Sequence, residues 1–400
     1  MRNYELRMEV GSRQSSDISV GMSPLCVRLA RVRRGSAFAS RVCRGMIHLS
    51  RNPQPATRNI IIILLLTVVC RLSSSAQDLH FTQFFASPLT TSPSNTGFYN
   101  GDWRVGGNFK SQWPWATSPN ISNYRTFAIY GDVTLLRGKL PGKDWLGVGL
   151  VILNDRSGDG ELKVNKFQAS AAYHKAFGIS GKYILSAGIG IGYVAKSIDY
   201  GKLHFNDQWD PNNLFFDQGV GSTEPADEDA LRFIDLSAGT HFTYVHSKKF
   251  NVSTGLSLFH LNKPKESFPG RDNRLGMRPL VNVIAYTKIS DRVHLEPGFM
   301  WMYQQKAQEY ILDLLAGFTF LNEGKFKGSI VFVGAAGRPK DAIAPMVGFQ
   351  YKTLRIIMNY DVNVSSLQNA SNNNGGFEIS VVYTGQRDKG GPRMIPCPRL

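Results

Sequence analysis

The stretch that decides the fold is YILSAGIGIGYVA, residues Tyr183–Ala195. Its odd-numbered positions are tyrosine, leucine, isoleucine and alanine, whereas the even-numbered positions at its centre are serine and glycine. Side chains alternate between two faces with a period of two only in a β-strand. One face is therefore apolar with a tyrosine near each end, and the opposite face is small at its centre. This pattern is typical of a strand in an outer-membrane β-barrel, whose apolar face contacts lipid.

The same alternation recurs along the rest of the chain. It is clear in Arg232–Tyr244 and in Phe377–Tyr383, and it is blurred in 325–334 and 342–351. We expect about 14 strands in an all-β fold, a transmembrane antiparallel β-barrel. The expected strands lie near 103–113, 124–136, 145–155, 161–175, 182–198, 231–245, 250–261, 277–289, 293–304, 309–321, 325–334, 342–351, 354–362 and 376–384.

The expected connections divide into short turns and long loops, as they do at the two ends of a membrane barrel. Short turns are expected at 246–249, 290–292 and 322–324, and long loops at 201–230, 262–275 and 363–375. The alternative is a soluble β-sandwich, which buries one face of each strand against a second sheet. A sandwich rarely needs this many strands, or this many tyrosines and tryptophans at strand ends, in a single chain.

The chain ahead of the strands has the features of an export signal. Ile60–Cys70 is an apolar run of 11 residues behind Arg58, and small residues follow up to Ala76. It is too short for a helix that crosses a bilayer core of roughly 30 Å. We expect a signal peptide over 46–76, cleaved before Gln77, and an over-extended start over 1–45 without a fold. A transit peptide over 1–45 and lipidation at Cys70 are the alternatives.

Charge and cysteine content narrow the function classes. Of the formal net charge of +16, +9 lies in residues 1–76 and only +7 in the remainder, so the basic balance is weak evidence for nucleic acid as a partner. Cys397 is the only cysteine after Cys70. An intramolecular disulfide or a cysteine metal site in the mature chain is therefore excluded. No apolar run after residue 76 is long enough for a transmembrane helix.

Motifs for catalysis or for cofactor binding are weak. Gly190–Ala195 matches a dinucleotide-binding pattern by letter, but strand alternation continues through its glycines. The acidic loop 201–230 lacks the spacing of a calcium-binding loop. His241, His246 and His260 lie near serines such as Ser253 and Ser257, without the sequence of a nucleophile elbow. We expect no catalytic, metal or cofactor-binding residues and no enzymatic activity.

The start of the mature chain, QDLHFTQFFASPL at Gln77–Leu89, resembles the beginning of the PorP/SprF family of type IX secretion-system membrane proteins. That family follows its signal peptide with a Q-D-x-x-F-[ST]-Q-[FY]-x-x-x-P-L pattern and an N-P-A-x-x-G segment, which here reads SPSNTG. Further similar pieces are Ser111–Pro114, His260–Pro264, Tyr360–Asn363, Gly375–Ser380 and the final Pro396–Leu400.

The resemblance implies an outer-membrane barrel of a Gram-negative bacterium that serves protein secretion or gliding motility, without a cofactor. Its partners are then the type IX secretion machinery or a large secreted adhesin, in contact with outer-membrane lipid and not with nucleic acid. Residues 77–102 would form a plug or a docking element ahead of a barrel over 103–400. The candidate docking residues are Phe81, Phe84, Phe85, Pro396 and Arg399. Plugging the lumen and packing against the first strand are alternative roles for the three phenylalanines.

A passive or lipid-type transporter, with residues 77–102 as an internal plug, is the alternative function. Barrel closure brings the first and last strands together, so we expect Gln77–Leu89 and Pro396–Leu400 to lie near each other on the periplasmic side.

Overall fold

The structure is a computed structural model that describes residues 78–113, 124–158, 160–178, 181–211, 215–217, 219–223, 230–266, 273–320, 327–365 and 373–386. All of these residues belong to one compact unit, Ser74–Leu400. The predicted start region 1–45 and the predicted signal peptide 46–76 lie outside the described residues.

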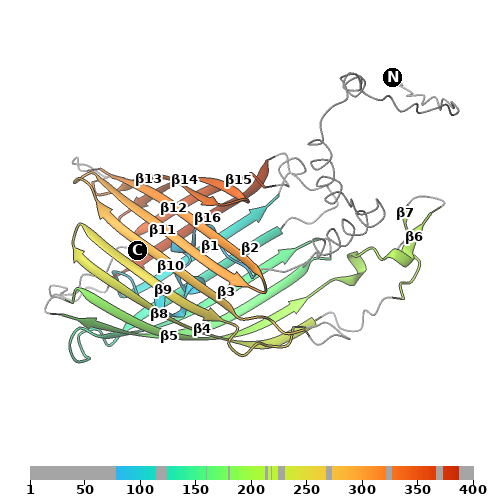
Figure 1. The fold of residues 1–400 in the computed structure, drawn as a ribbon, viewed down its shortest axis with the longest axis horizontal. Helices are drawn as coiled ribbons and strands as arrows, with labels where there is room; N and C mark the ends of the chain where they lie inside the picture. Colours follow the sequence, from blue (N-terminus) through green and yellow to red (C-terminus); the bar gives the residue numbers. More distant parts are fainter. Residues whose placement is uncertain are drawn as a thin grey trace, which may run out of the picture. The chain divides into compact units, whose positions relative to one another are not determined.

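Fourteen of the described strands form a closed antiparallel barrel (Figure 1). Each pairs with its neighbours in chain order, and β1 pairs with β16 to close the wall, with Trp103 opposite Gly385. The barrel strands are β1 (Trp103–Gln112), β2 (Tyr124–Leu135), β3 (Trp145–Ser157), β4 (Leu162–Phe177), β5 (Tyr183–Ser197), β8 (Ala230–Ser247), β9 (Phe250–Phe259), β10 (Arg278–Lys288), β11 (Val293–Gln304), β12 (Ala307–Thr319), β13 (Ile330–Arg338), β14 (Ala342–Tyr351), β15 (Leu354–Asn363) and β16 (Asn374–Gly385). The predicted antiparallel barrel is confirmed.

The two faces of β5 divide as the alternation predicts. Ile189 and Ile191 are 69% and 53% exposed on the outside of the barrel, whereas Ile184 and Ser186 are completely buried on the inside. In β8, Asp235 faces inward while Ile234 faces outward. Contact between large apolar side chains and lipid has no free-energy cost, whereas exposure of the same surface to water would be unfavourable. The described residues contain no helix that is long and apolar enough to cross a membrane.

One strand is displaced from its predicted place. The sequence predicts a strand over 325–334, but β13 is Ile330–Arg338. Ile330 and Phe332 face inward and are buried, while Val333 faces outward with 53% exposure. Apolar residues therefore occupy both faces of this strand, and the alternation that fixes a register is lost. The alternation in β14 is blurred for the same reason, because the apolar residues Ala344 and Met346 also face inward.

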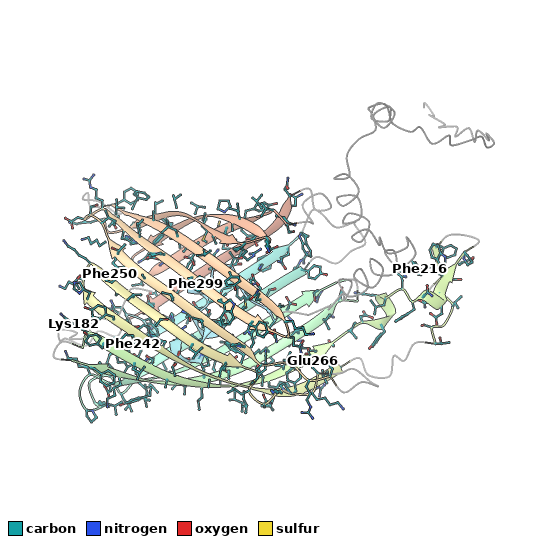
Figure 2. The ribbon with its side chains drawn as sticks, in the orientation of Figure 1. Lys182, Phe216, Phe242, Phe250, Glu266 and Phe299 are labelled. Atoms are coloured by element: carbon teal, nitrogen blue, oxygen red, sulfur yellow. The ribbon has the colours of Figure 1, made fainter. Side chains whose placement is uncertain are left out.

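The two ends of the barrel differ in their connections. The turn mouth, as we call one end, carries the connections at 136–144, 178–182, 248–249, 289–292, 320–329 and 352–353, together with the start of β1 and the end of β16. The loop mouth, at the opposite end, carries the longest connections, between β5 and β8 and between β9 and β10. In Figure 2 the turn mouth is on the left, near Lys182 and Phe250, and the loop mouth is near Glu266.

A small two-stranded sheet lies in the connection between β5 and β8. It consists of β6 (Trp209–Asp210) and β7 (Phe215–Phe216), preceded by the short 3-10 helices η4 (Tyr200–Lys202) and η5 (Asn206–Gln208). The sequence predicts only an acidic loop here. Each strand is two residues long, which is too short to show a period.

Candidate functional site

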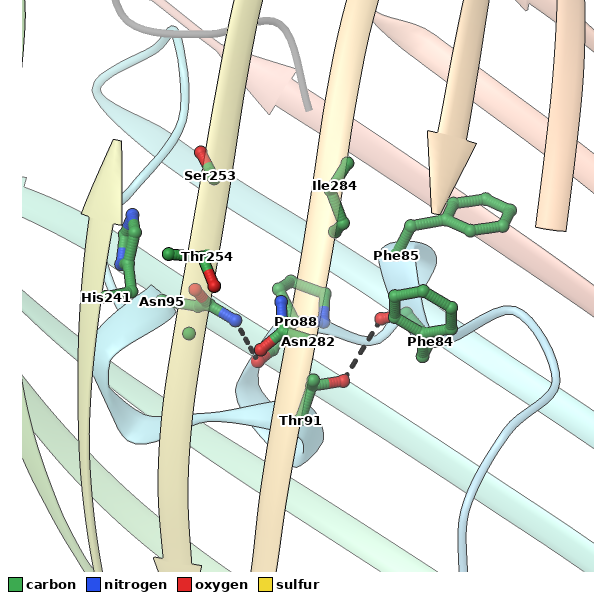
Figure 3. Close-up of a pocket in the computed structure, with 11 residues that line it drawn as sticks. Phe84, Phe85, Pro88, Thr91, Asn95, His241, Ser253, Thr254, Asn282 and Ile284 are labelled. Atoms are coloured by element: carbon green, nitrogen blue, oxygen red, sulfur yellow. Dashed lines mark hydrogen bonds between the residues drawn. The ribbon is translucent and has the colours of Figure 1, made fainter. Parts of the chain in front are cut away.

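The segment from Asp78 to Asp102 lies inside the barrel and runs from the loop mouth to the turn mouth. It forms the turn η2 (Phe84–Ala86), the single helical turn α3 (Pro88–Thr91) and the turn η3 (Pro93–Asn95). Pro88 and Pro93 begin the second and third turns, where a missing N–H costs nothing. Figure 3 shows these turns in the lumen, with Phe84, Pro88 and Asn95 beside the inner wall. We call residues 78–102 the lumenal segment.

An ionic cluster holds the first residue of the lumenal segment at the loop mouth. The Asp78 carboxylate lies 3.1 Å from His260 Nε2 and 3.3 Å from Arg278 Nη2, and the Asp78 N–H donates to Gln304 at 2.9 Å. His260 also pairs with Asp235 at 2.8 Å. Although burial opposes ionisation, Arg278 and His260 hold the pKa of the Asp78 carboxyl well below its usual range.

Further charged groups of the wall bind the residues that follow. His80 pairs with Glu309 at 2.9 Å, and the Thr82 hydroxyl accepts a hydrogen bond from Arg338. Arg338 also pairs with Asp361 at 2.9 Å. The contacts with the segment come from β12 and β13, and β15 holds Arg338, so His80 and Thr82 are fixed to one side of the wall.

Glu378 of β16 binds the backbone of the segment directly. Its two carboxylate oxygens accept hydrogen bonds from the N–H groups of Thr82 and Gln83 at 3.0 and 2.8 Å. The Gln83 side chain donates to Asn359 at 2.6 Å. A buried carboxylate that accepts two N–H groups satisfies donors that have no partner within a turn.

The three predicted docking phenylalanines point into the barrel. Phe84 is 2% exposed and packs among inward apolar side chains of β9–β15, including Phe332 and Met300. Phe81 is 3% exposed and packs on Ala128 and Leu153, and Phe85 is half-buried beside the cluster of Phe84. They fill the lumen, where a partner has no access to Phe81 or Phe84. Pro396 and Arg399 lie outside the described residues.

Glycines of the wall allow the second half of the segment to approach it closely. A Cβ at Gly188 of β5 would lie 2.5 Å from the Pro93 carbonyl oxygen, and one at Gly239 of β8 would lie 2.4 Å from Ser92 Oγ. A Cβ at Gly147 of β3 would lie 2.0 Å from the Thr96 carbonyl oxygen. Any larger residue at these positions displaces η3 or the residues that follow it.

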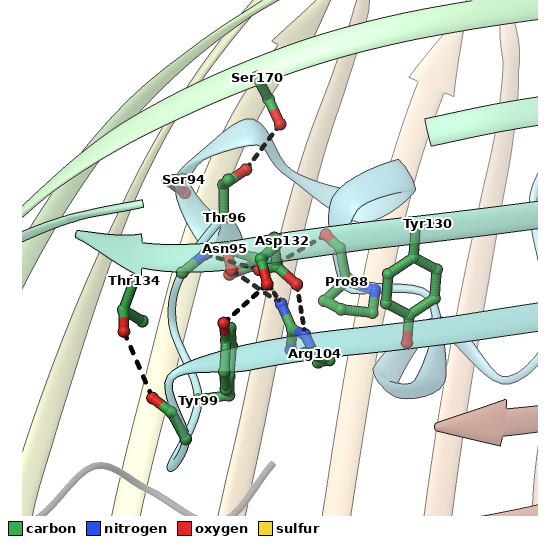
Figure 4. Close-up of polar contacts among 12 residues, drawn as sticks. Pro88, Ser94, Asn95, Thr96, Tyr99, Arg104, Tyr130, Asp132, Thr134 and Ser170 are labelled. Atoms are coloured by element: carbon green, nitrogen blue, oxygen red, sulfur yellow. Dashed lines mark hydrogen bonds and ion pairs between the residues drawn. The ribbon is translucent and has the colours of Figure 1, made fainter. Parts of the chain in front are cut away.

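A buried ion pair holds the end of the segment (Figure 4). Arg104 of β1 pairs with Asp132 of β2 at 2.8 Å, and the two side chains are 3% and 0% exposed. Arg104 also donates to the Asn95 carbonyl at 3.2 Å, and Asp132 accepts the Gly97 N–H at 2.7 Å. The Tyr99 ring lies 4.5 Å from the guanidinium. Both charges are therefore hydrogen-bonded as well as paired, as buried charges require.

Two buried histidines complete the contact near the turn mouth. His174 Nε2 lies 2.8 Å from the Thr96 carbonyl, so this nitrogen carries the proton, and the other ring nitrogen lies 2.7 Å from Ser186 Oγ. The Phe98 ring stacks on His174, with centroids 5.7 Å apart, and meets the His241 ring edge-on, with centroids 4.1 Å apart. This serine–histidine pair is a contact of the wall with the segment, because both residues are completely buried.

The predicted position of Gln77–Leu89, at the end of the barrel where the first strand begins and the last strand ends, is wrong for Asp78. Trp103 and Gly385 do lie together at the turn mouth, as an even number of strands requires. Asp78, however, contacts His260, Arg278 and Gln304 at the loop mouth. The even-number argument constrains only the strands, and the lumenal segment crosses the barrel before the first strand begins. Gln77 and Pro396–Leu400 lie outside the described residues.

The other candidate chemistries can now be placed. Gly190–Ala195 continues as strand β5 with no helix behind it, so its match to a dinucleotide motif is accidental. In the acidic loop the Asp207 carboxylate accepts hydrogen bonds from Ser222 and from Thr223. No group of three or more histidine, cysteine, aspartate or glutamate residues in the described part of the chain is arranged to hold a metal ion.

Several residues of this site escape sequence reasoning, namely Arg104, Asp132, Arg338, Glu378 and the glycines that face η3. A signal was present for some of them. Glu378 lies within the strand expected over 376–384, and Arg104 is the second residue of the strand expected over 103–113, each at a position that faces the lumen. A charge at such a position needs a partner inside the barrel.

A comparison with protein families shows the family of this chain. A family model described as "Type IX secretion system membrane protein PorP/SprF" matches residues 73–383. The chain belongs to the PorP/SprF family. Residues of the PorP/SprF pattern that the sequence shows at 77–89, including Asp78, Phe81, Gln83 and Phe84, lie in the lumen. No curated protein sequence matches the chain.

Solved structures match the chain at low similarity. The toluene transporter TbuX of Ralstonia pickettii is 8% identical over 74% of this chain and 92% of its own, with a TM-score of 0.43. A FadL homologue of Pseudomonas aeruginosa is 10% identical over 74% and 94%, with a TM-score of 0.41. BamA from Haemophilus ducreyi, lacking POTRA domains 1–3, is 9% identical over 71% and 70%, with a TM-score of 0.36.

Proposed function

We propose that this PorP/SprF protein is a plugged outer-membrane barrel that links the motor or an adhesin cargo of the type IX secretion system to the outer membrane. In this proposal it acts as an anchor and a docking component, without enzymatic activity or cofactor. It serves secretion or gliding through the partners that it holds, and solutes do not pass through its lumen.

The observation that carries the proposal is the position of the family pattern. Residues that define the start of the mature chain, such as Asp78, Gln83 and Phe84, bind the inner wall instead of an outer surface. The segment is fixed at the loop mouth by Asp78 and at the turn mouth by Gly97, which bonds Asp132. Because the segment is bound at both ends, it fills the lumen permanently. A segment that opens and closes a channel needs one end free to move.

The alternative is a passive or lipid-type transporter in which the segment moves aside. The described cavities beside the segment disfavour it. One, lined by Phe84, Asn282 and His241, has a volume of about 10 Å3, and another beside Arg104 and Tyr130 has about 20 Å3 (Figure 3). Each has room for about one water molecule.

The sidedness follows from the connections. Bacterial barrels keep short turns in the periplasm and long loops outside the cell. The described chain ends at the turn mouth with Gln386, and Pro396 and Arg399 follow it in sequence. We therefore assign the docking of the periplasmic machinery to the turn mouth and to these C-terminal residues. Phe81, Phe84 and Phe85 support docking indirectly, because they keep the lumen filled.

The test is export of type IX cargo in cells that carry variants of the protein. Deletion of residues 396–400 should reduce cargo at the cell surface several-fold and leave the amount of inserted barrel unchanged. Ile289→Ala is the matched control, because Ile289 is 63% exposed at the turn mouth and lies far from the C-terminus in sequence. Normal export in cells that lack the whole protein contradicts the proposal.

The transporter alternative has its own measurement. Purified protein in planar bilayers should conduct no ions in the wild-type form. Steady wild-type conductance, or uptake of a solute into liposomes at neutral pH, would favour transport over docking.

A further inference from the structure

The connection between β5 and β8 carries an aromatic surface that lies beyond the barrel. His204, Trp209, Phe215 and Phe216 are grouped on and beside the sheet β6–β7, and we call these four residues the aromatic arm. Trp209, Phe215 and Phe216 are 40%, 48% and 41% exposed. Figures 1 and 2 show β6, β7 and Phe216 beyond the ends of the barrel strands.

Lipid does not account for this exposure. On β5 the outward apolar residues extend from Tyr183 to Tyr193, which is about the length of strand that spans a bilayer. The strand then continues through Lys196, which pairs with Glu266 of the next loop. The aromatic arm comes after this polar level, on the loop side. Exposed aromatic groups outside the membrane mark an interaction surface.

The arm is built by specific contacts within the described part of the loop. The Phe216 ring lies 4.9 Å from Trp209 and 5.1 Å from His204. Gln208 bonds the backbone of Asp217 and Val220, at 2.8 and 3.0 Å. The aromatic rings are therefore held in place before a partner arrives, which lowers the entropy cost of binding.

Charge indicates the kind of partner. Three acidic residues, Asp207, Asp210 and Asp217, neighbour the arm in the described part of this loop, and Lys202 is the only lysine or arginine of that part. Lys202 is already paired with Glu161 at 2.6 Å. Acidic groups around exposed aromatic rings attract arginine or lysine, which stack on tryptophan and phenylalanine faces. The same negative charge repels an anionic lipid surface.

We propose that the aromatic arm docks an arginine- or lysine-rich segment of an exported protein at the outer face of the barrel. This inference rests on the proposed function, because it assigns a receiving surface to the same secretion role. The contact needs no lumen and no covalent step.

The first experiment measures binding to the purified full chain in detergent micelles. The probe is a fluorescent 12-residue peptide of alternating arginine and tyrosine, compared with one in which glutamate replaces arginine. We expect the arginine peptide to bind and the glutamate peptide not to bind. The double substitution Trp209→Ala with Phe216→Ala should weaken binding at least tenfold. Met277→Ala is the control, because Met277 is 41% exposed in a different loop of the same mouth.

Other outcomes overturn the inference. Equal binding of both peptides, or unchanged affinity in the double variant, removes the arm as a cation-binding surface. Quenching of Trp209 by brominated lipid in nanodiscs places the arm in the membrane and also overturns it. Phe215→Ala is a second, milder variant in case the double substitution disturbs the loop, and it should weaken binding several-fold.

The second experiment separates this inference from the proposed function. Cells with the double variant should deliver several-fold less type IX cargo to the surface, with normal amounts of inserted barrel. If loss of the whole protein abolishes delivery and the double variant does not, the arm is not the receiving surface and the proposed function stands. If loss of the whole protein has no effect, the proposed function itself fails.

Discussion

The inner wall of this barrel has two unlike halves. Strands β1–β5 and β8 present many polar groups and glycines to the lumen, such as Asp132, His174 and Gly188, whereas β9–β15 also present a large cluster of apolar side chains, such as Met300 and Phe332. The lumenal segment is divided in the same way. Its turn η3 lies against the polar half, and Phe84 packs on the apolar half.

The difference shows that the interior is a binding surface for one particular peptide. A water-filled lumen requires polar groups on every strand. Here inward apolar side chains such as Met300 and Phe332 form one cluster with Phe84, and an inward glycine, Gly188, faces the backbone of η3. The two halves should therefore respond differently to substitution.

The largest effect is expected in the polar half. Arg104→Ala leaves Asp132 buried without its partner, which should cost about 3–5 kcal/mol of unfolding free energy. Urea titration of the barrel in lipid vesicles measures this loss. Arg104→Met combined with Asp132→Asn removes both charges and should cost clearly less. If the single and the double variant are equally stable, the ion pair does not hold the segment.

In the apolar half, a cavity should lower the free energy of unfolding somewhat less than the loss of Arg104 does. Phe84→Ala removes a ring among inward apolar side chains and should cost about 3 kcal/mol, since the filled lumen relaxes only in part. Phe85→Ala is the matched control, because Phe85 is only partly buried beside the same cluster. A greater loss from Phe85→Ala than from Phe84→Ala would reverse the packing that we describe. The same urea titration gives both values.

The glycines of the polar half should respond to added volume. Gly188→Leu forces η3 away from β5 and should cost about 1–3 kcal/mol, as overpacking does in other cores. Ala187→Leu, one residue earlier on the lipid face, should cost little. Limited proteolysis of the lumenal segment provides a second measurement, with faster cleavage expected only in the Gly188 variant. Equal behaviour of the two variants would mean that Gly188 does not contact η3.

The smallest effect is expected at the loop mouth, where Asp78 is 29% exposed. Arg278 and His260 lower the pKa of Asp78 in the folded protein, so its contribution is present above the unfolded pKa of about 4. It is lost as the pH falls through the folded pKa. At neutral pH the free energy of unfolding of the wild type should exceed that of Asp78→Asn by about 1 kcal/mol, and the difference should vanish in acid. Urea titration at several pH values measures it. A difference that is independent of pH would assign the effect to packing.

Much of the barrel can be predicted from the sequence because each strand repeats one rule. The alternation in Tyr183–Ala195 fixes which face meets lipid, and β5 has the predicted inward and outward residues. The rule fails at Ile330 and Phe332, which face inward toward the cluster of Phe84. A strand beside an apolar filling has no polar face, so its sequence alone does not reveal its register.

The site was less predictable because it depends on contacts between distant parts of the chain. Glu378 binds Thr82 and Gln83 across almost 300 positions, and such pairings have no local signal. The family pattern at 77–89 indicates which residues matter. It does not indicate the direction of the segment through the barrel, because an extended segment of short turns has no periodicity.

The path of the lumenal segment constrains how the protein is assembled. Asp78 lies at one mouth, while β1 begins at the other and is hydrogen-bonded to β16. If the wall closed first, residues 78–102 would have to pass through a lumen narrowed by inward side chains. It is simpler for the wall to form around a segment already laid across it, so that the joining of β1 and β16 is the last step. A tag placed just before Asp78 would then lie at the loop mouth, and the lumenal segment behind it would stay enclosed once the wall has closed.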